Sequence, residues 1–468
     1  MFVSGLDQTV VVTVLPQVIA DFEVPITRLD DAAWIVTAYL LGYTAAMPLI
    51  GRAADVYGYR PLLLLACAFF AAGSWWAAEA DGLWQLVAAR AVQAVGGGGL
   101  VPVALAAAAA LYEGRKRVLA LGLIAGATEA GAVLGPLYGA AVLDTLDWRW
   151  VFWLNLPLSL LIVVLVLALV AAGGGMSERV DWIGAALAGL ALLALTVGLS
   201  GEGLGDRPIE LLAAAALGGA FAVRQLRARY PLLERSLYRH AGFVAANAAN
   251  LLIGGALVVA LVEVPLFAVV VLDRSPTEGA LMLLRFTALI PLGALLGGWL
   301  GGRLPYSAVA AGGMLASAAG FALLARWDAD VGEPEISLDL ALAGTGFGIV
   351  LAPLAGAALA AARGGSEAVA SASLTIARTI GMTVGLAALT TWGLEAFRQR
   401  TSGLLLPLRE QGESEADYGS RVDRYETQVT DAAVWVFDRI FVVAAALCVL
   451  AAATALWLRE SRRLPEAG

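Results

Sequence analysis

The sequence predicts an all-α integral membrane protein with about fourteen transmembrane helices. Hydrophobic residues make up 60% of the 468 residues and charged residues only 15%, which leaves too little polar surface for a soluble protein of this length. The apolar residues are gathered in stretches of about 20, the length that spans a bilayer. Glycine is abundant, with 53 residues, and small side chains let membrane helices approach one another closely.

The expected helices follow one another with short polar linkers. They lie near residues 2–22, 34–53, 61–79, 84–111, 117–143, 150–172, 182–200, 209–226, 241–271, 279–301, 306–326, 338–362, 368–397 and 431–458. If the N-terminus is cytoplasmic, most arginines fall in cytoplasmic linkers and few fall in outer ones, for example Arg52, Arg60 and Arg303 inside. The positive-inside rule therefore predicts that both termini are cytoplasmic.

The spans form groups of six, two and six. Residues 1–172 are the expected N-terminal bundle, 173–240 a two-helix insertion followed by a basic amphipathic linker, and 241–468 the C-terminal bundle. The linker is either an interfacial helix or an ordinary positively charged loop. A weak repeat, in which the glycine-rich stretch after residue 51 recurs after residue 297, supports paired halves of the kind that secondary transporters have.

The last outer loop is unusually long. The helix that begins near residue 368 has no clear breaker before Gly403, so it would reach roughly 45 Å, beyond the hydrocarbon core of about 30 Å. A charged stretch with helical spacing follows, before the final span. We expect a hairpin over about 397–432 to project from the outer surface, with an irregular loop as the alternative.

Charged residues within the expected spans include Asp7, Arg90, Glu129, Glu263, Arg285 and Arg378. A charge within the bilayer is costly, so such residues are functional candidates by default. A carboxyl group kept out of water can bind and release a proton near neutral pH, which makes Asp7, Glu129 and Glu263 candidates for proton coupling. Asp7 could instead be a boundary residue, because only six residues precede it, and a native N-terminus longer than this one would fit the short start of the first helix.

The intramembrane arginines need carboxylate or carbonyl partners. Arg378 is a candidate partner for either Asp7 or Glu129, and Arg90 is a second ion-pairing candidate. If protonation of the acid breaks such a pair, proton binding is linked to a conformational equilibrium. Static structural pairs are the alternative. Glu263 and Arg285 could simply pair with each other.

Two local patterns complete the candidate site. Asp55 and Arg60 flank a tight loop, where they could clamp the cytoplasmic side in one state or form a plain surface turn. Glycines recur every four residues on one helix face, with a proline that can kink the helix, and this face suits close packing against another helix. These residues are Gly131, Gly135, Pro136 and Gly139.

Several function classes are disfavoured. Cys67 and Cys448 lie in apolar segments and the single histidine, His240, lies in a loop, so we expect no disulfide framework, metal site, cofactor or catalytic cluster. No basic stripe suggests nucleic acid. An intramembrane enzyme would need His, Cys or metal-ligand clusters that the sequence lacks. A non-transporting scaffold would leave the charges inside the spans unexplained.

Taken together, these motifs resemble those of the major facilitator superfamily. Gly51–Arg60 is similar to its loop motif between helices two and three, although Tyr59 and Pro61 occupy positions that are often basic. Arg90 with Gln93 resembles the fourth-helix motif, and Gly131–Gly139 resembles the antiporter motif of the fifth helix. The resemblance implies two six-helix bundles, here with two extra central helices, and export by antiport.

Further segments narrow the resemblance to the fourteen-helix drug:proton antiporter branch, and within it to mycobacterial lipid exporters that work with a periplasmic lipoprotein. They are Leu6–Val11, Trp34–Tyr43, Asp147–Pro157 and Ala377–Met382. The resemblance implies that Asp7, Glu129 and Arg378 are functional charges, that protons and a triacylglyceride-like lipid are the transported species, and that a monomer resides in the bacterial inner membrane. A multidrug:proton antiporter for amphiphilic drugs is the alternative, and the long outer hairpin favours the lipid.

Overall fold

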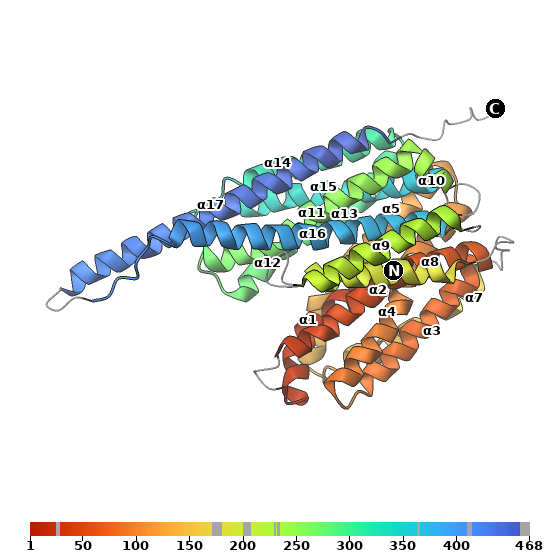
Figure 1. Cartoon of the computed structure of the whole chain (residues 1–468), viewed down its shortest axis with the longest axis horizontal. Coiled ribbons are helices and arrows are strands. Elements are labelled where there is room, and N and C mark those ends of the chain that lie inside the picture. The colour runs from red at the N-terminus through yellow and green to blue at the C-terminus, as the bar shows by residue number, and fades with distance from the viewer. Residues whose placement is uncertain are drawn as a thin grey trace.

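The structure is a computed structural model that describes residues 1–24, 29–170, 180–199, 207–228, 231, 235–362, 366–409 and 414–458. All regular elements in these ranges are helices (Figure 1). Fourteen segments of the described chain are long and apolar enough to cross a membrane, so the predicted fold class and number of spans are confirmed.

The first helix group, α1 to α7, comprises six spans. Its helices are α1 (Phe2–Asp21), α2 (Leu29–Tyr57), α3 (Tyr59–Ala78), α4 (Leu83–Leu111), α5 (Gly114–Leu143), α6 (Trp150–Trp153) and α7 (Asn155–Leu169). Within this group α1 packs along α5, and α4 packs along both α2 and α3. Glycine permits the α3–α4 contact, because a Cβ at Gly73 would lie 2.3 Å from the backbone N of Gln93.

Two inserted helices follow, α8 (Trp182–Leu199) and α9 (Pro208–Arg227). α8 packs on α2, where a Cβ at Gly189 would meet Ala45, and α9 packs on α8. Arg224 at the end of α9 is paired with Asp181 at the start of α8 at 2.9 Å, which ties the two helices together at one end. Of the expected amphipathic linker, only the short helix α10 (Arg235–Arg239) is helical in the described chain, and residues 229–230 and 232–234 lie outside the described residues.

The second helix group, α11 to α17, supplies the remaining six spans. Its helices are α11 (Ala241–Val270), α12 (Pro276–Thr287), α13 (Leu289–Gly301), α14 (Tyr306–Leu324), α15 (Glu335–Ala361), α16 (Glu367–Thr401) and α17 (Glu415–Ala455). α11 packs along α16 and α17, while α15 packs along α13 and α14.

Two spans are interrupted, and proline explains both interruptions. A proline has no N–H and cannot bond the carbonyl four residues earlier. Pro157 therefore leaves the carbonyl of Trp153 without its usual partner, and α6 ends at Trp153. In the same way, Pro291 lies four residues after Thr287, where α12 ends. Each pair of helices still forms one span.

The two helix groups meet at one end of the molecule. There α5 packs on α13 and α2 packs on α16. Small residues make the contact: a Cβ at Gly122 would lie 2.8 Å from the carbonyl oxygen of Ala294, and one at Gly51 would lie 3.0 Å from that of Ala368. Toward the opposite end the two groups diverge (Figure 1).

α16 and α17 are the longest helices and continue as a pair beyond the ends of the others (Figure 1). With 41 residues, α17 alone measures about 60 Å. The rings of Trp392 and Trp435 lie 6.3 Å apart near the base of this projection, and Arg400 covers Trp435 at 3.7 Å. At the tip, Leu405 is 88% exposed.

Candidate functional site

Asp7 lies at the centre of a buried polar cluster in the first helix group. Its carboxylate accepts three side-chain hydrogen bonds, from Arg90 Nη1 at 2.6 Å, from Gln93 Nε2 at 2.9 Å and from Asn155 Nδ2 at 2.9 Å. Asp7 is 0% exposed, so this ion pair is removed from water. The donors satisfy the buried charge that would otherwise be very costly. We call these four residues the Asp7 cluster.

Aromatic and hydroxyl side chains surround this cluster. The guanidinium of Arg90 lies 4.0 Å from the ring centroid of Tyr39 and 5.7 Å from that of Phe152, both within the range of a cation–π interaction. Gln93 also donates to Ser74 Oγ at 2.8 Å. Every residue named here belongs to α1, α2, α3, α4, α6 or α7, so the whole assembly lies within the first helix group.

The second ion pair joins the two helix groups. Arg378 Nη1 on α16 donates to Glu129 Oε1 on α5 at 2.9 Å, with side chains that are 24% and 17% exposed. Of the two partners expected for Arg378, the structure therefore pairs it with Glu129, and Asp7 is paired with Arg90 instead. Unlike the Asp7 cluster, this pair has one partner in each group and is partly exposed.

The glycine motif of α5 explains where Glu129 points. A Cβ at Gly131 would lie 2.1 Å from the carbonyl oxygen of Phe2, and one at Gly135 would lie 2.0 Å from Thr9 Oγ1, so this face packs tightly on α1. Glu129 is about 200° around the helix from Gly131 and faces away from α1. The face formed by Gly131, Gly135 and Gly139 therefore packs within the first helix group, because its partner α1 belongs to the same group.

Asp55 does connect the two groups. Its carboxylate accepts hydrogen bonds from the backbone N–H groups of Ala368 at 3.0 Å and Val369 at 3.1 Å, in the first turn of α16. A helix N-terminus has unpaired N–H donors and a partial positive charge, both of which favour a carboxylate. Nearby, Tyr59 donates to Glu367 Oε2 at 3.4 Å.

Arg60 does not take part in this contact. It donates through Nη2 to the carbonyl oxygen of Leu167 on α7, at 3.2 Å, and so ties α3 to α7 within the first group. Of the two residues that flank the loop, Asp55 contacts the N-terminus of α16, and Tyr59 rather than Arg60 lies beside it.

The pairing suggested for Glu263 and Arg285 is wrong. Arg285 forms an ion pair with Glu333, in the loop before α15. Glu263 on α11 is buried, at 6% exposure, and within the described part of the chain it makes no hydrogen bond or ion pair. A buried carboxyl group without a partner strongly disfavours its charged form.

Sequence reasoning gave no role to Asn155, Tyr39 or Ser74. Asn155 was visible as a lone amide in an apolar run, but its partner could not be identified because Asp7 is 148 residues away. Among the described residues, no group of three or more His, Cys, Asp or Glu side chains is placed to hold a metal ion.

Fourteen candidate spans in the described chain define a multi-pass membrane protein. Residues 1–386 match the family model described as Major Facilitator Superfamily. The chain belongs to the major facilitator superfamily, which confirms the expected membership and places it with transporters rather than enzymes.

Curated relatives are similar over most of their length. A triacylglyceride transporter of Mycolicibacterium hassiacum is 38% identical over 100% of this chain and 91% of its own. Those of Mycolicibacterium smegmatis and Mycobacterium tuberculosis are 37% and 36% identical, over 97% of this chain and 84% and 92% of theirs.

Solved structures support the same fold. A human organic anion transporter matches with a TM-score of 0.62, and the transporter FucP in its outward conformation matches with 0.61. Each is 15% identical and aligned over 96% of both chains.

Proposed function

We propose that this protein is a proton-coupled secondary transporter that exports a triacylglyceride-like lipid across the bacterial inner membrane by alternating access. The observation that carries the proposal is the Glu129–Arg378 pair, which joins the two helix groups inside the membrane-spanning region and is partly exposed. The triacylglyceride transporters among the relatives support a lipid substrate.

The membrane orientation follows from the basic residues. The turn near Arg60, the linker with Arg115 and the loop with Arg303 all lie at the end where the two groups meet. By the positive-inside rule this end is cytoplasmic. Closed contacts there and divergence at the other end correspond to a state that opens toward the outside. We propose that the bundles 1–172 and 241–468 rock about the site between them.

Glu129 is the stronger candidate for the coupling proton. Protonating Asp7 would remove its charge-assisted bond with Arg90 and weaken the bonds that Gln93 and Asn155 donate, all within its own helix group. It would also leave Arg90 buried without a counter-charge. Neutralising Glu129 loosens one contact between groups, and its side chain is 17% exposed rather than fully buried. We therefore propose that Asp7 holds the first bundle together, while protonation of Glu129 releases Arg378 and permits the change of state. Glu263, which has no partner in the described chain, is a further candidate for proton binding.

Asp55 would act as the cytoplasmic latch. Its two hydrogen bonds to α16 exist only while the inner ends of α2 and α16 touch. Opening this end breaks both bonds and also the contact of Tyr59 with Glu367. The latch therefore stabilises the state that is closed on the cytoplasmic side.

The hairpin formed by α16 and α17 supports a lipid rather than a small drug. Trp392 and Trp435 would mark the outer membrane interface, where aromatic residues gather. Beyond it, the 17 residues before Ala432 at the start of α17 reach about 25 Å into the periplasm. Each CH₂ of a lipid chain exposed to water costs about 0.8 kcal/mol, so a guide toward a carrier such as a periplasmic lipoprotein would be useful.

Reconstitution in liposomes with an imposed pH gradient tests the function. Labelled triacylglyceride and an amphiphilic dye would be compared in the unaltered protein, in Glu129→Gln and in a variant lacking residues 399–430. We expect the gradient to drive lipid movement, Glu129→Gln to abolish gradient-driven movement, and the deletion to abolish lipid delivery while dye movement continues. Dye movement without lipid movement in the unaltered protein would favour the drug antiporter, and lipid transport that ignores the gradient would refute proton coupling.

A further inference from the structure

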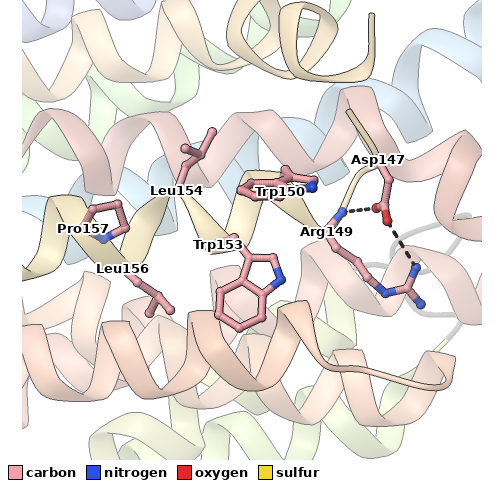
Figure 2. A pocket seen from close by; sticks show the side chains of 7 residues that line it. All are labelled: Asp147, Arg149, Trp150, Trp153, Leu154, Leu156 and Pro157. Carbon is pink, nitrogen blue, oxygen red and sulfur yellow. Dashed lines mark hydrogen bonds and ion pairs between the residues drawn. The ribbon is translucent and has the colours of Figure 1, made fainter. Parts of the chain in front are cut away.

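A pocket of about 400 Å³ lies along the segment from Asp147 to Pro157, and none of the residues that line it belongs to either intramembrane ion pair. Figure 2 shows that the lining residues change from charged at one end of the pocket to apolar at the other. Asp147 and Arg149 lie at one end, Trp150 and Trp153 in the middle, and Leu156 and Pro157 at the far end. Its volume is within the range of about 300 to 1,000 Å³ that is typical of ligand sites. A charged end and an apolar end suit an amphiphile.

The charged end has a surplus of negative charge. Arg149 is engaged within the protein, because Nη1 donates to Asp21 Oδ2 at 2.8 Å and Nη2 donates to the carbonyl oxygen of Ala80 at 3.3 Å. Its Nη1 is 3.8 Å from Asp147 Oδ2, and the Asp147 side chain is 55% exposed. Two carboxylates thus share one guanidinium, and the exposed carboxylate of Asp147 is available to a cation.

The aromatic residues suit the same ligand. Trp150 is 44% exposed and lies next to Arg149 in the pocket. An ammonium group that reaches Asp147 can lie against an indole face, which adds a cation–π attraction. The backbone between Asp147 and Arg149 is anchored, because the side chain of the intervening Trp148 is buried and donates to Asp21 through Nε1 at 3.2 Å.

We propose that this pocket binds the ammonium headgroup of an outer-leaflet phospholipid of the phosphatidylethanolamine type. Asp147 and Trp150 would bind the ammonium, and the acyl chain would run along Leu156 and Pro157 toward the membrane core. In the proposed orientation the pocket lies between the outer end of α5 and the start of α7, at headgroup level. The lipid would also press on the segment whose Asn155 donates to Asp7.

Native mass spectrometry of the full chain, extracted from nanodiscs with equal phosphatidylethanolamine and phosphatidylglycerol, tests the proposal. We expect phosphatidylethanolamine to be retained preferentially and Asp147→Asn to lower its retention about tenfold, the effect of one charge-assisted contact. The asparagine oxygen can still accept from the backbone N–H of Arg149, so the turn is preserved. Asp144→Asn, an exposed acid in the same loop, is the matched control and should change nothing.

A second measurement keeps the proposal testable if the loop is disturbed. Phosphatidylethanolamine with brominated acyl chains should quench the part of the tryptophan emission that Trp150→Phe removes, and phosphatidylglycerol with the same chains should quench it less. Equal retention of the two lipids, or unchanged retention in Asp147→Asn, would overturn the proposal. Neither readout depends on proton coupling, so failure here leaves the proposed transport function intact.

Discussion

Replacing Glu129 by Gln should move the protein toward the state that is open to the cytoplasm. The change removes a charge-assisted hydrogen bond that joins the two helix groups. Such bonds contribute about 1.5–3 kcal/mol when buried, and partial exposure of both side chains lowers this to about 1–2 kcal/mol. The ratio of inward-open to outward-open molecules should therefore rise by roughly 5- to 30-fold.

Distances between spin labels measure this ratio. Labels on cysteines introduced at Glu113 and Leu304, both exposed, would report the separation of α5 and α13 at the inner end. The native Cys67 and Cys448 are buried and should remain unlabelled. We expect the long-distance population to grow in Glu129→Gln. In the unaltered protein, acidification should produce the same growth, because protonation removes the same charge.

Two controls make the interpretation specific. Glu395→Gln removes an exposed acid from α16 and should leave the distances unchanged. Arg378→Gln should reproduce the shift in the distances. Combining it with Glu129→Gln should add little, because both variants remove the same ion pair. If Glu129→Gln kept the full response to pH, the assignment of Glu129 as the coupling site would be refuted.

Three other perturbations follow from the packing. Asp7→Asn leaves Arg90 as a buried, unpaired charge and should destabilise the protein by about 3–5 kcal/mol, visible as a large fall in the melting temperature, whereas Glu129→Gln should barely change it. Asp55→Ala removes the cap of α16, worth about 1 kcal/mol, and should raise the inward-open population about fivefold in the spin-label assay; no shift would contradict the latch. Gly122→Val places a side chain against α13 and should force the inner ends apart, while Gly218→Val, where nothing lies within 4 Å, should not; equal effects would discount the close α5–α13 contact.

The spans could be predicted because a bilayer imposes a length and a polarity on each helix independently of its neighbours. Breaks in the helix within a single span could not be predicted to the same extent. Neither the separation of α6 from α7 nor that of α12 from α13 was expected, although Pro157 and Pro291 are visible in the sequence. A proline interrupts some spans and is accommodated within a continuous helix in others, as Pro136 is in α5. Tertiary packing decides which of the two occurs.

The charged residues show a similar division. Composition identified Asp7, Arg90, Glu129 and Arg378 because a charge in an apolar span is conspicuous. It left the partner of Arg378 open, since pairing depends on how helices far apart in sequence are juxtaposed. Asn155 was not identified, because placing an uncharged amide in a membrane helix costs little enough free energy that it can occur there for many reasons.

The charge balance of the Asp7 cluster affects how the protein responds to the membrane potential. With Asp7 and Arg90 in contact, the cluster has no net charge, and its displacement with the first bundle does no work against the membrane potential. Glu129 and Arg378 are balanced in the same way only until a proton arrives, after which a single positive charge remains on α16. Moving one elementary charge through 100 mV is worth about 2.3 kcal/mol. The loaded step would then respond to voltage, and the unloaded one would not.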